Sequence, residues 1–144
     1  MPSCLQTGQR GILLTSGNLD VELPDHVFAI ASVPHDWLFG LCSAVVHHGG
    51  AGTTAAALRA GVPAVIIPFG VDQPFWGKQV AKLGVGTLPI PQKQLTVANL
   101  AAAISVAVND QVIRDRAFNL GQKIRAEAGV AKAVELFHHY VRSS

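Results

Sequence analysis

The chain has 144 residues, of which 49% are hydrophobic and 14% charged, and its formal net charge is +2. This length allows one domain with a substantial core, and the composition is that of a globular chain. So small a charge, without a basic run, argues against nucleic-acid binding. The apolar runs are too short to span a membrane. Two cysteines, with no CxxC pair and no secretory leader, predict a cytoplasmic protein, which a partner could still bring to a membrane surface.

Two short strands are predicted in the N-terminal third. Gly11–Thr15 is apolar and is followed by the turn residues Ser-Gly-Asn, and Val27–Ile30 follows a chain break at Leu-Pro-Asp. Asn18 lies just past the first strand and is a weaker candidate for a ligand contact, since Ser-Gly-Asn is also ordinary turn chemistry.

The segment Val33–Phe39 follows the second strand. Pro34 restricts Val33 to extended geometry, which leaves the backbone groups of Val33 available to a flat base. Trp37 is expected to pack into the core beside Leu38 and Phe39.

The central stretch predicts a strand, a glycine turn and a helix. Ala44–Val46 is a short buried strand, Thr53–Ala60 is rich in helix formers, and Gly61 with Pro63 ends the helix. Between strand and helix the turn contains Gly49, Gly50 and Gly52, which allow the backbone to turn tightly and to approach a ligand closely. Because a helix N-terminus presents unpaired N–H groups and a positive dipole end, this turn is suited to an anion such as phosphate.

A second strand–loop–helix unit follows directly. Ala64–Ile67 is another predicted buried strand, and Asp72 and Gln73 precede Pro74, where a helix can begin. In open α/β sheets ligands bind beyond the carboxyl ends of the strands, where His47 and the Asp72–Gln73 pair lie. An imidazole and amides for phosphate, with a carboxylate and a carboxamide for hydroxyls, suit a sugar nucleotide.

The C-terminal part is predicted to be mostly helical. A last strand lies near Val85, and Thr96 is a good N-cap for Val97–Val108. Apolar residues at helical spacing predict Gln111–Glu127, and a final helix covers Ala131–Arg142.

The combined motif resembles a known signature. His47-His-Gly-Gly-Ala-Gly-Thr53, then Gly61-Val-Pro63, then Asp72-Gln-Pro-Phe-Trp76 is similar to the donor-binding signature of GT-B UDP-sugar glycosyltransferases, especially sterol glucosyltransferases and bacterial antibiotic-tailoring enzymes. The resemblance implies an α/β fold, namely the Rossmann-like, doubly wound C-terminal half of a GT-B enzyme, with residues 1–144 as the nucleotide-sugar donor-binding domain. The implied reaction is inverting transfer of a hexose, such as the glucose of UDP-glucose, to an acceptor hydroxyl on a sterol or other apolar compound.

The resemblance also implies roles for individual residues. The backbone at Val33 would hold the uracil, while Asp72 and Gln73 would bind the sugar hydroxyls. His47 would stabilise the UDP leaving group together with the amides of the turn, which comprises Gly49, Gly50, Ala51, Gly52, Thr53 and Thr54. His48 would support the turn, and Trp76 would either wall the sugar or pack in the core. With no DxD motif, no metal and no other cofactor is expected.

Three other interpretations use the same residues. Gly50-Ala-Gly-Thr-Thr-Ala55 fits the G-x-G-x-x-G/A pattern of NAD enzymes, with Asp72 at about the position of a ribose-binding acid. That turn, however, follows two earlier strands and adjoins two histidines. A metal site at His47 and His48 is rejected, since neighbouring strand residues point to opposite faces and no third ligand is suitably spaced. A non-catalytic nucleotide-sugar-binding subunit is the third interpretation.

The sequence also predicts that something is missing. The strand candidates near Ile12, Phe28, Val45, Val65 and Val85 correspond to strands two to six of the 3-2-1-4-5-6 order, so the central first strand is absent. The second and fourth strands would then be separated by about two strand spacings of ~4.8 Å. We expect re-pairing, poor folding alone, or, as favoured, a strand from an acceptor-binding N-terminal domain, a partner chain or a second copy. The general base is expected in that missing acceptor domain.

Overall fold

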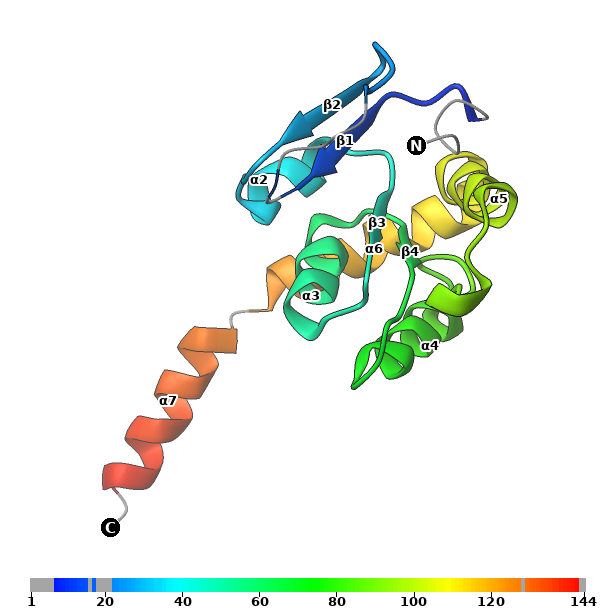
Figure 1. The fold of residues 1–144 in the computed structure, drawn as a ribbon. Coiled ribbons are helices and arrows are strands. Elements are labelled where there is room, and N and C mark those ends of the chain that lie inside the picture. Colours follow the sequence, from blue (N-terminus) through cyan, green and yellow to red (C-terminus); the bar gives the residue numbers. More distant parts are fainter. Residues whose placement is uncertain (1–6, 16, 18–21, 128, 143–144) are drawn as a thin grey trace.

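A computed structural model describes residues 7–15, 17, 22–127 and 129–142 of the chain (Figure 1). It is an α/β protein in which short parallel strands precede or alternate with helices, and the C-terminal third is helical. The elements are β1 (Gly11–Leu14), β2 (Val27–Ile30), α2 (His35–Leu38), the 3₁₀ turn η1 (Phe39–Leu41), β3 (Val45–His47), α3 (Ala51–Ala60), β4 (Ala64–Ile66), α4 (Gln73–Leu83), the 3₁₀ turn η2 (Gln92–Gln94), α5 (Val97–Asn109), α6 (Gln111–Ala126) and α7 (Gly129–Arg142).

The strands form two separate sheets within the described residues. β1 pairs with β2 in parallel, and β3 pairs with β4 in parallel, but β1 and β3 are not hydrogen-bonded neighbours. Figure 1 shows the β1–β2 pair as a layer apart from β3 and β4. The predicted separation of the second and fourth strands of the doubly wound order is therefore confirmed.

The strand predicted near Val85 is reduced to one parallel bridge between Ala64 and Gly86. The chain nevertheless runs along β4, since Thr87 N–H donates to Ala64 O at 3.1 Å and Ile90 N–H donates to Ile66 O at 2.9 Å. Close approach explains why a glycine is found here: a Cβ at Gly86 would overlap the Ala64 carbonyl and the Val80 side chain.

Two apolar clusters make up the core. One joins α2, η1 and β3 to the inner face of α3, and its buried members are Leu38, Phe39, Val45, Ala57 and Val62. The other lies between β4, α4 and α6, and its buried members are Ala64, Ile66, Val80, Val85 and Ala117. Both clusters border the β3–β4 pair, and all three residues of β4 are buried, whereas Val46 of β3 is exposed.

The helix ends follow their sequence signals. Gly61 and Gly84 end α3 and α4 in the left-handed conformation, with φ of 74° and 67°. Thr96 caps α5 in a full capping box with Asn99. Pro74 lies in the first turn of α4, as predicted.

Two sequence-based expectations concern Trp37 and Asn18 in the N-terminal third of the chain. Trp37 is 62% exposed, so its predicted place in the core is wrong. Only four residues form α2, and the helical rotation that buries Leu38 turns its neighbour Trp37 outward. The candidate Asn18 lies outside the described residues.

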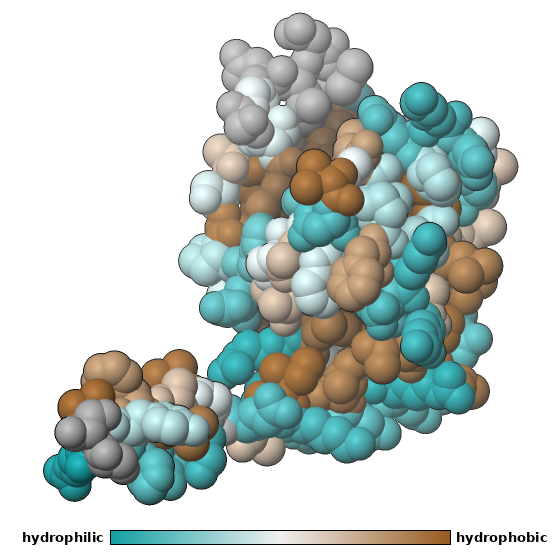
Figure 2. All heavy atoms as spheres, turned by 90° about the horizontal axis from the view of Figure 1, so that it is seen from below, coloured by the Kyte–Doolittle hydropathy of each residue, from teal (hydrophilic) through white to brown (hydrophobic). Residues whose placement is uncertain are grey.

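The last helix, α7, projects away from the rest of the molecule (Figure 1). Its apolar residues are exposed, among them Val130, Val134, Phe137 and Val141, which recur at helical spacing. Seen from below, apolar side chains gather both on α7 and on the main body (Figure 2).

Candidate functional site

The glycine turn between β3 and α3 has, at Gly49, a geometry that favours glycine. Gly49 has a φ of 90°, in the region that side chains rarely adopt. A Cβ there would also lie 2.6 Å from Cγ2 of Ile66 and 3.2 Å from the carbonyl oxygen of Gln73. The turn is thus pressed against the end of β4 and the start of α4.

His47 is the last residue of β3, and its ring reaches back to the turn. The Gly49 N–H donates to Nδ1 of His47 at 3.0 Å, while Nε2 of His47 is buried without a hydrogen-bond partner among the described residues. Burial, together with the nearby imidazoles of His48 and His35, lowers the pKa of His47 to about 4. The ring is therefore neutral at pH 7.

The amides at the start of α3 are the unpaired hydrogen-bond donors of the candidate site. No hydrogen bond joins the N–H groups of Gly50, Ala51, Gly52 and Thr53 to another described residue. These are the orphan donors that every α-helix has in its first turn, at the positive end of the helix dipole.

Two of the amides predicted to bind the diphosphate, those of Gly49 and Thr54, are already used within the chain. The amide of Gly49 is already bonded to His47, and that of Thr54 donates to the Gly50 carbonyl at 2.9 Å. The side chain of Thr54 is buried in the core, with the residue only 1% exposed. Thr54 thus supports the helix start and offers a ligand neither its amide nor its hydroxyl in this conformation.

His48 adjoins the turn from outside. Its ring lies so close to Gly50 that a Cβ on Gly50 would overlap Nε2 of His48. The support of the turn by His48 stays a prediction, and the structure places its ring against Gly50.

Asp72 and Gln73 are held in fixed orientations. Oε1 of Gln73 accepts the backbone N–H groups of Phe69 at 2.8 Å and Gly70 at 3.3 Å, so its carboxamide NH₂ is turned away from these donors. Oδ2 of Asp72 accepts the indole N–H of Trp76 at 3.0 Å, which leaves Oδ1 as an acceptor. A carboxylate acceptor and an amide donor side by side can bind neighbouring hydroxyl groups.

The fold brings the glycine turn and the Asp72–Gln73 pair together. His47 pairs with Ile66 in the parallel β3–β4 ladder, so both strands end at the same edge. Gly49 packs against Gln73, with the Gln73 Cβ 3.6 Å from the position of a Cβ on Gly49. Trp76 is half-buried and bonded to Asp72, and is thus tied to the site through the carboxylate.

Val33, the residue predicted to hold the base, lies in the segment between β2 and α2. Its side chain packs on the core cluster of Leu38, Phe39, Val45, Ala57 and Val62, while its backbone takes part in no hydrogen bond of the described chain.

Sequence reasoning missed Val71, in the loop between β4 and α4. It has a φ of 57°, which is an outlier for a β-branched residue, and it is 98% exposed. Strained backbone of this kind occurs at functional sites, where it costs about 1–3 kcal/mol. Only its position between Gly70 and Asp72 could have drawn attention to it.

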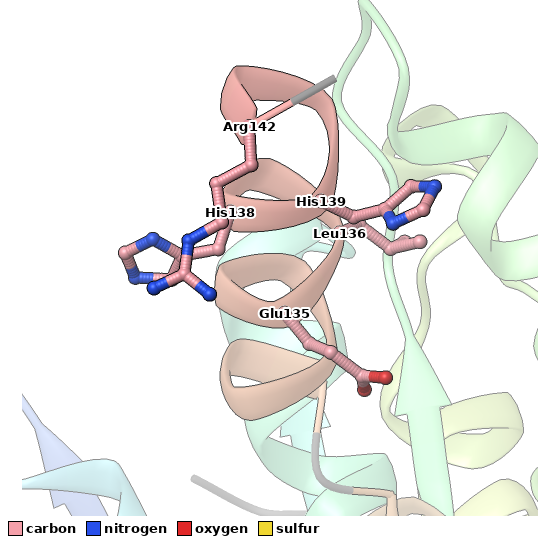
Figure 3. Close-up of a pocket in the computed structure, with 5 residues that line it drawn as sticks. All are labelled: Glu135, Leu136, His138, His139 and Arg142. Carbon is pink, nitrogen blue, oxygen red and sulfur yellow. The ribbon is translucent and has the colours of Figure 1, made fainter.

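A separate hollow lies on α7 and does not belong to this site. Figure 3 shows its lining residues projecting from the one helix in different directions: Glu135, Leu136, His138, His139 and Arg142.

In the described part of the chain no group of three or more His, Cys, Asp or Glu residues is placed to hold a metal ion. No described helix is both long and apolar enough to cross a membrane.

The comparison with protein families assigns the chain. Residues 12–136 match the family described as "Erythromycin biosynthesis protein CIII-like, C-terminal domain", and the chain belongs to this family of GT-B glycosyltransferase C-terminal domains. It is 47% identical over 139 residues to sterol 3-beta-glucosyltransferase UGT80B1 of Arabidopsis thaliana, covering 94% of this chain and 22% of that protein. It is also 47% identical over 124 residues to the sterol 3-beta-glucosyltransferase of Emericella nidulans, covering 86% of this chain and 9% of that protein.

Solved structures agree with this assignment. The calicheamicin glycosyltransferase CalG4 matches with a TM-score of 0.84 at 25% identity, over 98% of this chain and 39% of that one. Glycosyltransferase VinC in complex with DTDP matches with a TM-score of 0.78 at 27% identity, over 85% of this chain and 31% of that one. The chain thus spans about a fifth of the plant relative and about a third of these solved chains.

Proposed function

We propose that the chain binds the donor of a UDP-dependent hexosyltransferase, with UDP-glucose as the donor, for inverting transfer to an acceptor hydroxyl. The observation that carries this proposal is the row of unpaired amides from Gly50 to Thr53, which follows directly on Gly49, the residue that packs against Gln73. A nucleotide sugar joins a diphosphate and a sugar in one molecule. Its site therefore needs phosphate-binding amides and hydroxyl-binding side chains close to each other.

The diphosphate is bound by the amides at the start of α3. Negative charge develops on the UDP leaving group as the glycosidic bond breaks, and preorganised N–H donors stabilise that charge without reorganisation. His47, which accepts the Gly49 N–H, stabilises the leaving group together with these amides. The proposed mechanism requires no metal or other cofactor, because the charge is met by amides and the helix dipole.

Asp72 and Gln73 bind the hexose hydroxyls. Their unshared polar atoms, Oδ1 of Asp72 and the NH₂ of Gln73, have the acceptor and donor character that a pair of sugar hydroxyls requires. The uracil lies at Val33, whose backbone N–H and C=O suit the edge of the base.

The acceptor and the general base are supplied from outside the described residues. The relatives named as sterol 3-beta-glucosyltransferases are several times longer than this chain, which agrees with an additional acceptor-binding domain. We extend this to a sterol or similar apolar compound as the acceptor class. The same additional chain, or a partner, supplies the strand that pairs with β1 and β3.

Calorimetry with UDP, UDP-glucose, TDP and NAD tests the proposal. TDP is included because VinC was solved with DTDP. Binding of UDP and UDP-glucose, with weaker TDP and no NAD binding, is expected. Preference for NAD would replace the proposal with the dinucleotide interpretation. A second candidate, a subunit that binds the nucleotide sugar without catalysis, is favoured if the chain together with its acceptor domain binds UDP-glucose yet transfers no sugar.

A further inference from the structure

Val71 has a backbone conformation that the fold does not require of a valine. The Gln73 N–H donates to the Gly70 carbonyl at 3.2 Å, so Val71 occupies the second position of a tight turn, with a φ of 57°. Turns with a positive φ at this position usually place glycine there. Within the described part of the chain, Val71 is the one residue other than glycine that has a positive φ. Because its side chain is also exposed, neither the turn nor the core explains a valine here, and such strained residues occur where a site contacts its ligand.

Two aromatic residues accompany Val71 in the same segment. Phe69 and Phe75 are 60% and 56% exposed, and together with Val71 they form the apolar rim. The chain has no charged residue between Arg59 and Asp72. Large apolar side chains exposed beside a polar site are typical of a binding surface.

The apolar rim belongs to the same segment as the side chains proposed for the hexose. Oε1 of Gln73 accepts the Phe69 N–H at 2.8 Å. Val71 directly precedes Asp72, and the Phe75 N–H donates to the Asp72 carbonyl at 3.0 Å. Hydrogen bonds within the segment therefore hold the rim next to the hydroxyl-binding pair.

Transfer of a hexose requires the acceptor to lie beside the sugar. In a reactive arrangement the acceptor oxygen lies about 3–3.5 Å from the anomeric carbon. That carbon belongs to the same ring as the hydroxyls proposed to bind Asp72 and Gln73. The skeleton that carries the acceptor hydroxyl therefore comes within reach of the segment from Phe69 to Phe75. Exposed valine and phenylalanine side chains favour contact with an apolar skeleton, since the contact removes apolar surface from water.

We propose that the apolar rim, with Val71 as its most exposed member, contacts the apolar skeleton of the acceptor and helps to determine which alcohols receive the sugar. The inference rests on the proposed function, because it places the acceptor next to a hexose held by Asp72 and Gln73. The acceptor class is a large apolar alcohol such as a sterol. The alternative is that the rim joins this chain to another protein chain.

Two nearly isosteric substitutions separate apolar contact from backbone conformation. Val71→Leu and Val71→Asn both replace the β-branched side chain with a γ-branched one of similar size, and leucine alone keeps the apolar character. The probe is the fluorescent sterol dehydroergosterol, supplied from cyclodextrin with UDP present. Its binding is followed by energy transfer from Trp76, whose ring lies 5.3 Å from that of Phe75, in a Trp37→Phe background. We expect Val71→Leu to bind the sterol within about threefold of the unchanged Val71, and Val71→Asn to bind it roughly 10-fold more weakly.

The control places the same chemical change elsewhere. Val130→Asn alters an exposed valine on α7 and should leave sterol binding unchanged. Equal sterol affinity of Val71→Leu and Val71→Asn, or no saturable sterol binding by the unchanged chain, would overturn the proposal. Light scattering tests the alternative, since a difference in mass between these two variants at equal sterol affinity would assign the rim to association of chains.

Calorimetry with UDP-glucose distinguishes this inference from the proposed function. Both Val71 variants should bind UDP-glucose within about twofold of the unchanged chain, because the substitution leaves Asp72 and Gln73 in place. If UDP-glucose binds while the two variants do not differ in sterol binding, the acceptor role of the rim fails and the proposed function stands. If the unchanged chain does not bind UDP-glucose, the proposed function fails, and a remaining difference between the variants would show a sterol-binding surface unconnected with sugar transfer.

Discussion

The two parallel strand pairs differ greatly in their burial. All three residues of β4 are buried, and α3, α4 and α6 surround the β3–β4 pair through the two core clusters. In the β1–β2 pair only Val27 is buried, and large apolar side chains such as Ile12 and Phe28 are exposed. Strand propensity is similar in the two pairs. The comparison teaches that a strand becomes core when helices pack against it, as they do against β4, and the candidate site is built at the ends of β4 and its neighbour β3.

The largest expected effect concerns the uncovered edge between the two pairs. We expect the isolated chain to associate or to unfold over a broad temperature range, since among the described residues β1 and β3 each have a strand neighbour on one side alone, whereas a parallel sheet buries its strands. Adding the chain segment that precedes these residues in a longer protein should give a monomer with sharp unfolding. Size-exclusion chromatography with light scattering and a thermal scan measure both properties. A monomeric isolated chain with sharp unfolding and normal UDP binding would show that the two pairs are self-sufficient.

Hydrogen exchange measures the same contrast residue by residue. Amides of β1 and β2 should exchange faster than those of β3 and β4, because local opening of the exposed pair disrupts little packing. Similar protection in both pairs would mean that burial does not set their relative stability. The longer protein provides the control, since its β1–β2 amides should become as protected as those of β3–β4.

Two glycines separate folding from binding within the better-buried half. Gly49→Ala should destabilise the fold by about 1–3 kcal/mol from backbone strain alone, with the overlap on Ile66 adding to this. Gly52→Ala meets no atom within 4 Å and should leave the fold intact or stabilise α3 slightly, yet weaken UDP by crowding the amides. Thermal unfolding and calorimetry distinguish the two effects. Unchanged UDP affinity in Gly52→Ala would argue against close approach of the diphosphate.

Asp72 should distinguish the sugar from the nucleotide. Asp72→Ala removes an acceptor proposed for the hexose, so UDP-glucose should bind about 10-fold more weakly while UDP is nearly unaffected. Asp115→Ala, which removes an exposed carboxylate on α6, is the matched control for the change in charge. Equal losses for UDP and UDP-glucose would show that Asp72 supports the loop instead.

The pH dependence of stability should report the buried His47. Its pKa in the folded state is lowered to about 4 from an ordinary 6.5, so the unfolded chain binds the proton more readily between these values. Unfolding should therefore become easier as the pH falls from 6.5 towards 4, and little should change above 6.5. In His47→Asn this part of the dependence should be absent. An unaltered slope in that variant would assign the effect to other groups.

The smallest expected effect is relief of strain at Val71. Asparagine tolerates the left-handed conformation better than a β-branched residue, so Val71→Asn should stabilise the chain by about 1 kcal/mol. Thermal unfolding of the variant beside the unchanged chain measures this. Destabilisation would mean that Val71 makes contacts that its 98% exposure does not reveal.

Much of this arrangement could be predicted from the sequence, because local signals determine it. Gly61, Gly84 and Thr96 mark helix ends by their own chemistry, and the glycine turn, with Asp72 and Gln73, follows from strand–turn–helix spacing. Long-range facts were out of reach. Whether Trp37 faces the core depends on packing between distant segments, and the local bonds of the Thr54 and Gly49 amides depend on the exact start of α3 and on the ring orientation of His47, which residue types alone do not specify.

The central claim is that the turn after β3 binds the diphosphate of a UDP-sugar. Calorimetry of UDP-glucose with the unchanged chain and with Gly52→Ala tests it most directly, with circular dichroism to establish that both are folded. The account predicts binding by the unchanged chain and at least tenfold weaker binding by Gly52→Ala at equal stability. Equal affinity in both folded proteins would place the nucleotide elsewhere and contradict the account.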